Sequence, residues 1–204
     1  NVGELVVADI GIPDEVNLES GPEVATSAMI QAWLPSRPLD AHKGTFGKAM
    51  IVAGSANYTG AAILSAKAAL RGGTGLVTLA IASNLHPAIV SAVPESTYLL
   101  LPHALGVLNE HAAPILKKEI DDYDAMLVGP GLGNTPETKS FLTALFNLEI
   151  KRRNTGFIQS PDRENPKPGK LPALVIDADG LNLLSEIPEW HHHLPENSVL
   201  TPHP

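Results

Sequence analysis

The sequence predicts an α/β fold in which a mostly parallel sheet is covered by helices on both faces. From Lys48 onward, short continuous apolar runs alternate with longer segments of helical periodicity, the pattern of strands that alternate with crossover helices. The runs do not alternate between apolar and polar residues, which is typical of strands buried on both faces. Hydrophobic residues make up 44% of the chain and aromatic residues only 4%, so we expect a core of Ala, Val, Ile and Leu.

The apolar runs place the expected strands in order along the chain. We expect strands at residues 49–53, 76–82, 97–101, 125–128, 173–176 and 198–201, and helices at residues 60–71, 85–93, 109–119, 138–148 and 180–185. Residues 60–71 are Ala-rich and apolar almost all round, as in a helix packed tightly on a sheet. Residues 151–171 contain Gly156, Gly169 and prolines, and we expect a long loop there.

Residues 1–40 are rich in Pro and acidic side chains and contain one short apolar run at residues 5–12. We interpret them as a linker or as the tail of a preceding domain. The chain begins at Asn1 and stops after an apolar run, at Thr201-Pro202-His203-Pro204. We therefore expect a fragment of a longer protein, truncated at its C-terminal end.

Charge and composition exclude several classes of function. The formal net charge of −8 argues against a nucleic acid or an anionic membrane as the main partner. It leaves nucleotides open, because backbone amides and helix N-termini bind phosphate without net positive charge. The chain has no cysteine, which excludes disulfides and thiolate nucleophiles. We expect a cytoplasmic protein.

Two small-residue motifs follow predicted strands. In the first, Gly54-Ser55-Ala56-Asn57-Tyr58-Thr59-Gly60-Ala61-Ala62, the residues Gly60 and Ala61 let a ligand approach the backbone near a helix N-terminus, and Thr59 could cap that helix. In the second, Gly129-Pro130-Gly131-Leu132-Gly133-Asn134, backbone amides could point at a ligand. Tight turns and helix capping are the alternatives for both motifs.

Three further motifs carry polar side chains. Asp177 and Asp179, in Asp177-Ala178-Asp179-Gly180-Leu181-Asn182, could hold Mg²⁺, and Asp179 could also be the N-cap of the next helix. His203 lies between two prolines after a strand and could contact a ring or a phosphate, or simply be a solvent-exposed histidine. The run His191-His192-His193 is expected to form a polar loop, because adjacent residues do not share one face of a helix; a metal site is the alternative.

Taken in order, these motifs resemble the NAD(P)H-hydrate dehydratase family, over residues 40–204. The resemblance is carried by HKGTFGK at residues 42–48, AGS at 53–55, TGAA at 59–62, AALRGGTGLVT at 68–78, VGPGLG at 128–133, DADGLN at 177–182 and LTPHP at 200–204. Two departures are Thr59, where the family usually has Pro, and the longer loop at residues 151–171. Residues 4–13 look like the end of the family's frequent partner domain, an NAD(P)H-hydrate epimerase.

The resemblance implies a ribokinase-like fold and repair of hydrated NADH and NADPH, coupled to hydrolysis of ADP or ATP with Mg²⁺. It implies substrate binding near six residues: Gly60, Ala61, Gly131, Gly133, Asn182 and His203. It implies residues 1–40 as the tail of an epimerase domain with a linker, and residues 41–204 as the N-terminal part of the dehydratase domain. The family's catalytic Asp, in a Gly-x-Gly-Asp motif, follows the Thr-Pro-His-Pro motif, so we expect residues 1–204 alone not to catalyse.

Two rival functions are compatible with the same motifs. One is a kinase for a vitamin-precursor alcohol, on the same fold; the other is a nucleotide-binding module without turnover. The substrate partners expected from the resemblance are NAD(P)H hydrate and an adenine nucleotide, and we expect a homo-oligomer.

Overall fold

The computed structural model describes residues 24–34, 38–42, 44–148 and 171–203, together with Val6 and Ser36. The chain divides into two units, residues 1–40 and 41–204. In the first unit a short helix, α1 (Ser27–Trp33), was not predicted from the sequence; the Thr26 hydroxyl caps it by accepting the backbone N–H of Met29 at 3.3 Å. The resemblance over residues 4–13 lies outside the described residues apart from Val6.

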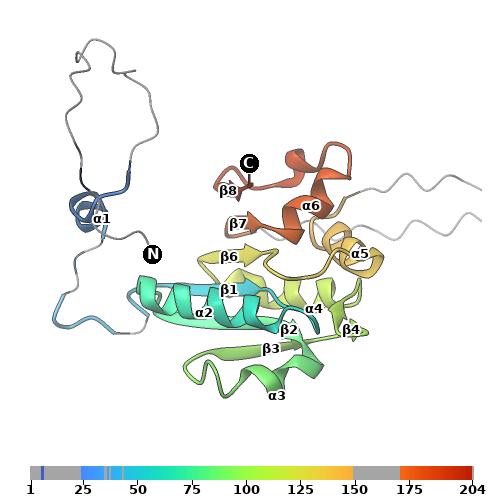
Figure 1. Ribbon diagram of the computed structural model, residues 1–204, viewed down its shortest axis with the longest axis horizontal. Coiled ribbons are helices and arrows are strands. Elements are labelled where there is room, and N and C mark those ends of the chain that lie inside the picture. Colours follow the sequence, from blue (N-terminus) through green and yellow to red (C-terminus); the bar gives the residue numbers. More distant parts are fainter. Residues whose placement is uncertain are drawn as a thin grey trace, which may run out of the picture. The chain divides into compact units, whose positions relative to one another are not determined.

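The second unit is built on a parallel sheet of six strands (Figure 1). The strands are β1 (Lys48–Val52), β2 (Leu76–Ala82), β3 (Thr97–Leu101), β6 (Ala125–Val128), β7 (Ala173–Asp177) and β8 (Ser198–Thr201). Their order in the sheet is β3-β2-β1-β6-β7-β8, and every pairing is parallel. The predicted α/β fold with a mostly parallel sheet is therefore confirmed.

Helices connect the strands and cover the sheet. They are α2 (Thr59–Gly72), α3 (His86–Ile89), α4 (Ala112–Glu119), α5 (Pro136–Leu145) and α6 (Asp179–Ser185), with 3₁₀ turns η2 (Ser83–Leu85), η3 (Ile120–Asp122) and η4 (Trp190–His193). In Figure 1, α2 lies in front of the sheet, and α4 lies behind it. This is the arrangement that right-handed crossovers give when the chain reverses its direction of travel across the sheet. No helix of the described part of the chain is long and apolar enough to cross a membrane.

The core lies between the sheet and these helices and is aliphatic. Met50, Val52, Leu79, Ile81 and Val128 on the central strands are all fully buried, as expected for strands covered on both faces. Ala62 and Ala66 are the buried residues of α2, and their small side chains let this helix pack closely on the sheet.

Some predicted bounds are wrong. The helix predicted at residues 85–93 is a 3₁₀ turn followed by the single-turn α3. The helix α4 starts three residues later than predicted, and α5 starts two residues earlier. An additional hairpin, β4 (His103–Ala104) with β5 (Val107–Leu108), follows β3 and was not predicted. The loop predicted at residues 151–171 lies outside the described residues, except Leu171.

Candidate functional site

The carboxyl ends of β1 and β6 form the point where the strand order reverses. From β1 the chain moves to β2 and β3, and it then returns to β6 on the other side of β1. In open parallel sheets, ligands bind beyond the strand ends at such a reversal. Both predicted small-residue motifs follow these two strands, so the fold places them side by side.

Backbone hydrogen bonds join the two motifs directly. The N–H of Gly54 donates to the carbonyl of Pro130 at 2.8 Å, and the N–H of Gly129 donates to the carbonyl of Val52 at 3.2 Å. Gly54 has a φ of +82°, a conformation that favours glycine. The loops after β1 and β6 are therefore held in one fixed arrangement.

Gly131 lies against the start of α2, in contact with Ala61, another predicted substrate residue. A Cβ built on Gly131 would lie 2.6 Å from the Cβ of Ala61 and 2.8 Å from that of Tyr58. Ala61 is half-buried, whereas Gly60 is exposed and has no atom within 4 Å of a built Cβ. The structure thus brings Gly60, Ala61 and Gly131 together and leaves open space over Gly60.

The sequence suggested two helix caps that the structure contradicts. Thr59 is the first residue of α2, whose N-cap is Tyr58, without a side-chain hydrogen bond. Asp179 is likewise the first residue of α6, whose N-cap is Ala178, again without one. In both cases the residue predicted as the N-cap is already the first residue of the helix, so the helix starts one residue earlier than predicted.

Asp179 instead binds the glycine loop after β6. Its Oδ2 accepts the backbone N–H of Gly133 at 2.9 Å, across 46 positions of sequence. Gly133 is buried, and it has a φ of +87°. A carboxylate that accepts a buried N–H satisfies a donor that would otherwise be costly to leave unpaired. Asp179 therefore positions this loop.

The turn between β7 and α6 is strained and tightly packed. Ala178 has φ 47° and ψ −122°, which glycine adopts readily and alanine rarely does. A Cβ built on Gly129 would lie 1.9 Å from the carbonyl oxygen of Asp177, and one on Gly180 would lie 2.9 Å from Gly129 Cα. The β6 loop and this turn approach each other so closely that only glycine fits at both contact points.

Asp177 is tied to the neighbouring strand β8. The hydroxyl of Thr201 donates to Asp177 Oδ1 at 2.8 Å and lies 3.3 Å from the carbonyl of Ile176. Asp177 and Asp179 are both half-buried, and Asn182 and His203 are exposed. In the described part of the chain, no hydrogen bond is present from the side chains of Asn182 or His203. They lie at the same end of the sheet as the glycine loops, on α6 and after β8.

The hairpin β4–β5 borders the site on the β3 side, and sequence reasoning missed it. The N–H of Ala56 donates to the carbonyl of Gly106 at 3.0 Å, which joins the hairpin to the loop after β1. At the tip, Leu105 has a φ of 50° and is fully exposed. The Leu105-Gly106 dipeptide was the available signal, because a glycine at a two-residue hairpin turn is typical.

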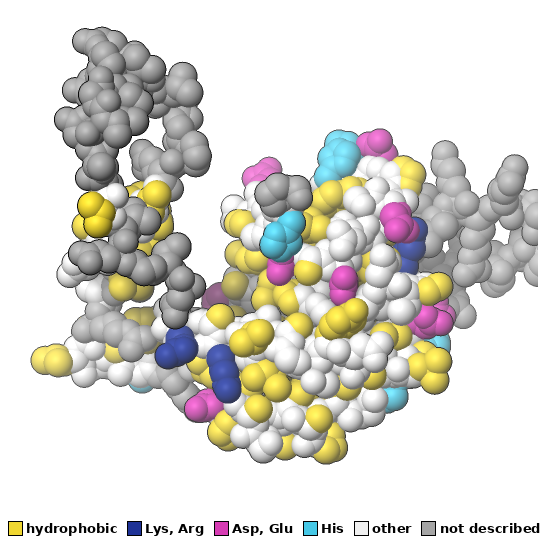
Figure 2. All heavy atoms as spheres, viewed as in Figure 1, with side chains coloured by type: hydrophobic (Ala, Val, Ile, Leu, Met, Phe, Trp, Pro, Cys, Tyr) yellow, Lys and Arg dark blue, Asp and Glu magenta, His cyan; other side chains and the backbone are white. Residues whose placement is uncertain are grey.

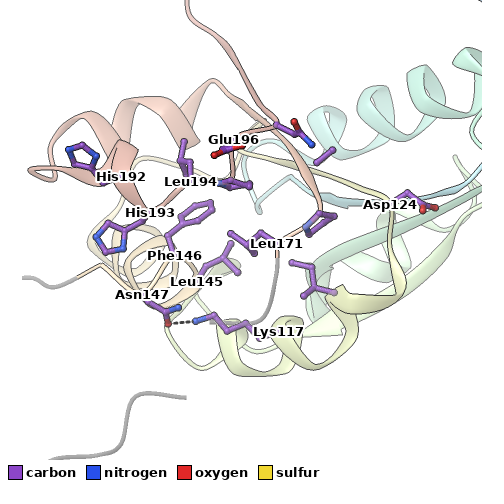
Figure 3. A pocket seen from close by; sticks show the side chains of 15 residues that line it. Lys117, Asp124, Leu145, Phe146, Asn147, Leu171, His192, His193, Leu194 and Glu196 are labelled. Atoms are coloured by element: carbon purple, nitrogen blue, oxygen red, sulfur yellow. Dashed lines mark hydrogen bonds between the residues drawn. The ribbon is translucent and has the colours of Figure 1, made fainter. Parts of the chain in front are cut away.

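A cavity lies at the opposite end of the strands (Figure 3). It has a volume of about 950 Å³ and is lined by Asp124 before β6, Ala173 at the start of β7 and Asn197 before β8. Lys117 of α4 borders it and donates to the carbonyl of Ala144 and to Asn147 Oδ1, at 2.5 and 2.6 Å. Burial lowers the pKa of Lys117 below its usual value. None of the predicted site residues lines this cavity.

Charged side chains on the face shown in Figure 2 are scattered, and its few basic side chains form no continuous patch. Backbone N–H groups of the glycine loops and helix N-termini can bind phosphate without basic side chains.

Comparison with known proteins identifies relatives of this arrangement. Residues 49–204 match the family model described as NAD(P)H-hydrate dehydratase. The bifunctional NAD(P)H-hydrate repair enzyme Nnr of Salinibacter ruber is 35% identical over 98% of this chain and 35% of its own length. The ADP-dependent (S)-NAD(P)H-hydrate dehydratase of Listeria monocytogenes is 28% identical over 84% of this chain and 51% of its own. The chain thus spans about a third to a half of these curated relatives.

Solved structures show the same fold. A protein from Streptococcus mutans matches with a TM-score of 0.63 and 25% identity, over 89% of this chain and 55% of that one. An ADP/ATP-dependent NAD(P)H-hydrate dehydratase from Bacillus subtilis, crystallised with ATP and Mg²⁺, matches with a TM-score of 0.50 and 27% identity, over 76% of this chain and 46% of that one. A ribokinase-like superfamily protein from Enterococcus faecalis, with a TM-score of 0.59 at 24% identity over 83% of this chain and 50% of that one, agrees in fold.

Proposed function

The chain belongs to the NAD(P)H-hydrate dehydratase family, and from that premise we propose that it forms the substrate-side part of an enzyme that dehydrates (6S)-NAD(P)H hydrate at the expense of ADP or ATP. The names of its bifunctional relatives support a parent protein that also epimerises the R and S hydrates. Residues 1–40 would then be the tail of the epimerase domain and its linker. A cytoplasmic location and a homo-oligomeric state are further predictions.

The observation that carries the proposal is the convergence of the glycine loops at the strand-order reversal. Gly131 meets Ala61, Gly133 is bound by Asp179, and the space over Gly60 is open. A backbone stripped of side chains at a helix N-terminus suits a flat ring with attached phosphates. We assign substrate binding to Gly60, Ala61, Gly131 and Gly133, with Asn182 and His203 as polar contacts at the same edge.

The chemistry follows from making a poor leaving group into a good one. The hydroxyl oxygen of the hydrated ring would attack the terminal phosphorus of the nucleotide, the phosphoanhydride bond to the shortened nucleotide would break, and the hydroxyl proton would pass to water or a base. The carbon–oxygen bond then breaks, phosphate departs with the electron pair, and a proton leaves the neighbouring ring carbon to form the double bond. The glycine loops of this chain would hold the ring and exclude water, so that the phosphorylated hydroxyl stays in place.

Asp177 and Asp179 fit a role as ligands of Mg²⁺, although each also has a structural contact. Each engages one carboxylate oxygen, with Thr201 and Gly133 respectively, and within the described residues the other oxygen of each accepts no hydrogen bond. Two partly free carboxylates suit Mg²⁺, which keeps several of its waters. When bound, Mg²⁺ would neutralise charge on the phosphoryl oxygens.

The test is an assay of the intact protein with hydrated NADH, following recovery of NADH absorbance with ADP and with ATP. We expect recovery that depends on the nucleotide. Thiazole and pyridoxine alcohols are offered in parallel. Stable phosphorylation of a vitamin alcohol with hydrated NADH left untouched would identify the rival kinase, and ligand-induced thermal stabilisation without any turnover would identify a binding module. Either result would overturn the proposal.

A further inference from the structure

Three side chains of types that can bind metal lie together between α6 and β8. Glu189, His191 and His192 each offer one ligand atom, and these atoms all lie within 4.8 Å of one another. All three residues are exposed. In Figure 2, histidine and acidic side chains adjoin at the top of the molecule, where Figure 1 places the segment after α6.

The backbone explains why only two of the three consecutive histidines join this group. Glu189 has a left-handed conformation, with φ 58° and ψ 15°, and the 3₁₀ turn η4 begins directly after it. Residues three apart in a 3₁₀ turn lie on the same side, so His192 is brought over Glu189. The N–H of His192 donates to the carbonyl of Glu189 at 3.1 Å. His193 is not part of this group, although both His192 and His193 border the cavity at the start of the strands; in Figure 3 the ring of His193 lies apart from that of His192.

The distances suit a small divalent cation. Glu189 Oε2 lies 3.0 Å from His192 Nε2, and two ligands of a tetrahedral ion with bonds of about 2.0–2.1 Å lie about 3.3 Å apart. The rings of His191 and His192 have centroids 4.2 Å apart and are tilted by 43°. Small rotations of exposed side chains would therefore bring all three ligand atoms onto one ion.

We propose that Glu189, His191 and His192 bind a divalent transition-metal ion such as Zn²⁺, with water completing its coordination. Two imidazoles and one carboxylate form a set that Zn²⁺ and its first-row neighbours accept, and Mg²⁺ prefers oxygen ligands alone. The net charge of −8 favours a cation near the surface. This site is separate from the carboxylates of the proposed function, because it precedes β8 whereas Asp177 contacts the end of that strand.

The test is titration of the intact protein with ZnCl₂ by calorimetry, in a buffer without chelators. Variants His191→Ala, His192→Ala and Glu189→Gln each remove one ligand. The matched control is His193→Ala, which removes the adjacent histidine of the same run and leaves the ligand set whole. We expect each ligand variant to weaken Zn²⁺ binding by about tenfold or more, and the control to bind within about twofold of the unmodified protein.

Spectroscopy with Co²⁺ adds a reading that a nonspecific surface interaction would not give. We expect the unmodified protein and His193→Ala to develop visible d–d absorption bands on adding Co²⁺, and His192→Ala to lack them. Circular dichroism checks that every variant keeps its fold. The proposal is overturned if the unmodified protein binds no Zn²⁺, or if His193→Ala weakens binding as much as the ligand variants do.

Discussion

A Cβ built on Gly131 would lie 2.6 Å from the Cβ of Ala61, so the loop after β6 touches the first turn of α2 without room for one methyl group. Gly131 also has a φ of +63°. Replacing Gly131 by Ala should therefore combine backbone strain with overpacking, and we expect it to lower the free energy of unfolding by about 2–4 kcal/mol. Gly133→Ala is the matched control, because its Cβ would have no neighbour nearer than 3.5 Å. Urea unfolding should show the smaller loss for Gly133→Ala; equal losses would contradict the packing argument.

Gly60 offers a test of substrate binding that does not depend on stability. A Cβ on Gly60 would meet nothing within 4 Å, and the same holds for Gly72 at the other end of α2. Both Ala variants should leave the protein unchanged or more stable by up to about 1 kcal/mol, since Ala is the better helix former. If substrate lies on the backbone at Gly60, only Gly60→Ala should raise the KM for hydrated NADH. Equal kinetics for the two variants would remove Gly60 from the site.

Asp179 can be tested for its structural contact and for its charge separately. Asp179→Ala should leave the buried N–H of Gly133 without its acceptor and cost about 1–3 kcal/mol of unfolding free energy. Asp179→Asn keeps an acceptor oxygen and should remain close to the unmodified protein in thermal unfolding. A large fall in kcat for the stable Asn variant would support a role for the charge in holding Mg²⁺. An Ala variant of unchanged stability would argue against the contact.

Ala178→Gly should not destabilise the protein, although replacing alanine by glycine usually does. At φ 47° and ψ −122° alanine is strained, and glycine would relieve the strain at the expense of greater freedom in the unfolded chain. We expect a melting temperature that is unchanged or raised, corresponding to between 0 and about 1 kcal/mol. Ala66→Gly, in the buried interior of α2, should instead destabilise by about 1 kcal/mol or more. Similar losses at both positions would rule out strain at Ala178.

Lys117 should make stability depend on pH in the alkaline range. Burial lowers its pKa in the folded protein, so between that pKa and its ordinary value the unfolded chain binds more protons. The contribution of Lys117 to the free energy of unfolding therefore rises with pH across this window. Lys117→Met should lower the free energy of unfolding by about 1–2 kcal/mol at neutral pH, a value reduced for partial exposure. The difference in stability from the unmodified protein should grow as pH rises. Lys118→Met, on the exposed side of the same helix, should show no such trend in urea unfolding at pH 7 to 10.5.

The sequence alone placed the strands and the motifs at their ends. The strands β2, β3, β6 and β8 begin and end where the apolar runs do. In the central strand β2, which is buried along almost its whole length, the run is uninterrupted because both faces require apolar side chains. Since parallel strands share one direction, the glycine loops and the aspartates had to lie at a common edge of the sheet. Family resemblance then followed from the order of these motifs.

Tertiary structure decided which groups at that edge meet. The acceptor for Gly133 is Asp179, 46 positions away, and no local pattern distinguishes this contact from a helix N-cap. The hairpin beside Ala56 and the left-handed conformation of Glu189 were likewise not predicted from the sequence. Each depends on a single backbone turn and on its distant neighbours, whereas periodicity reports only which face of an element is buried.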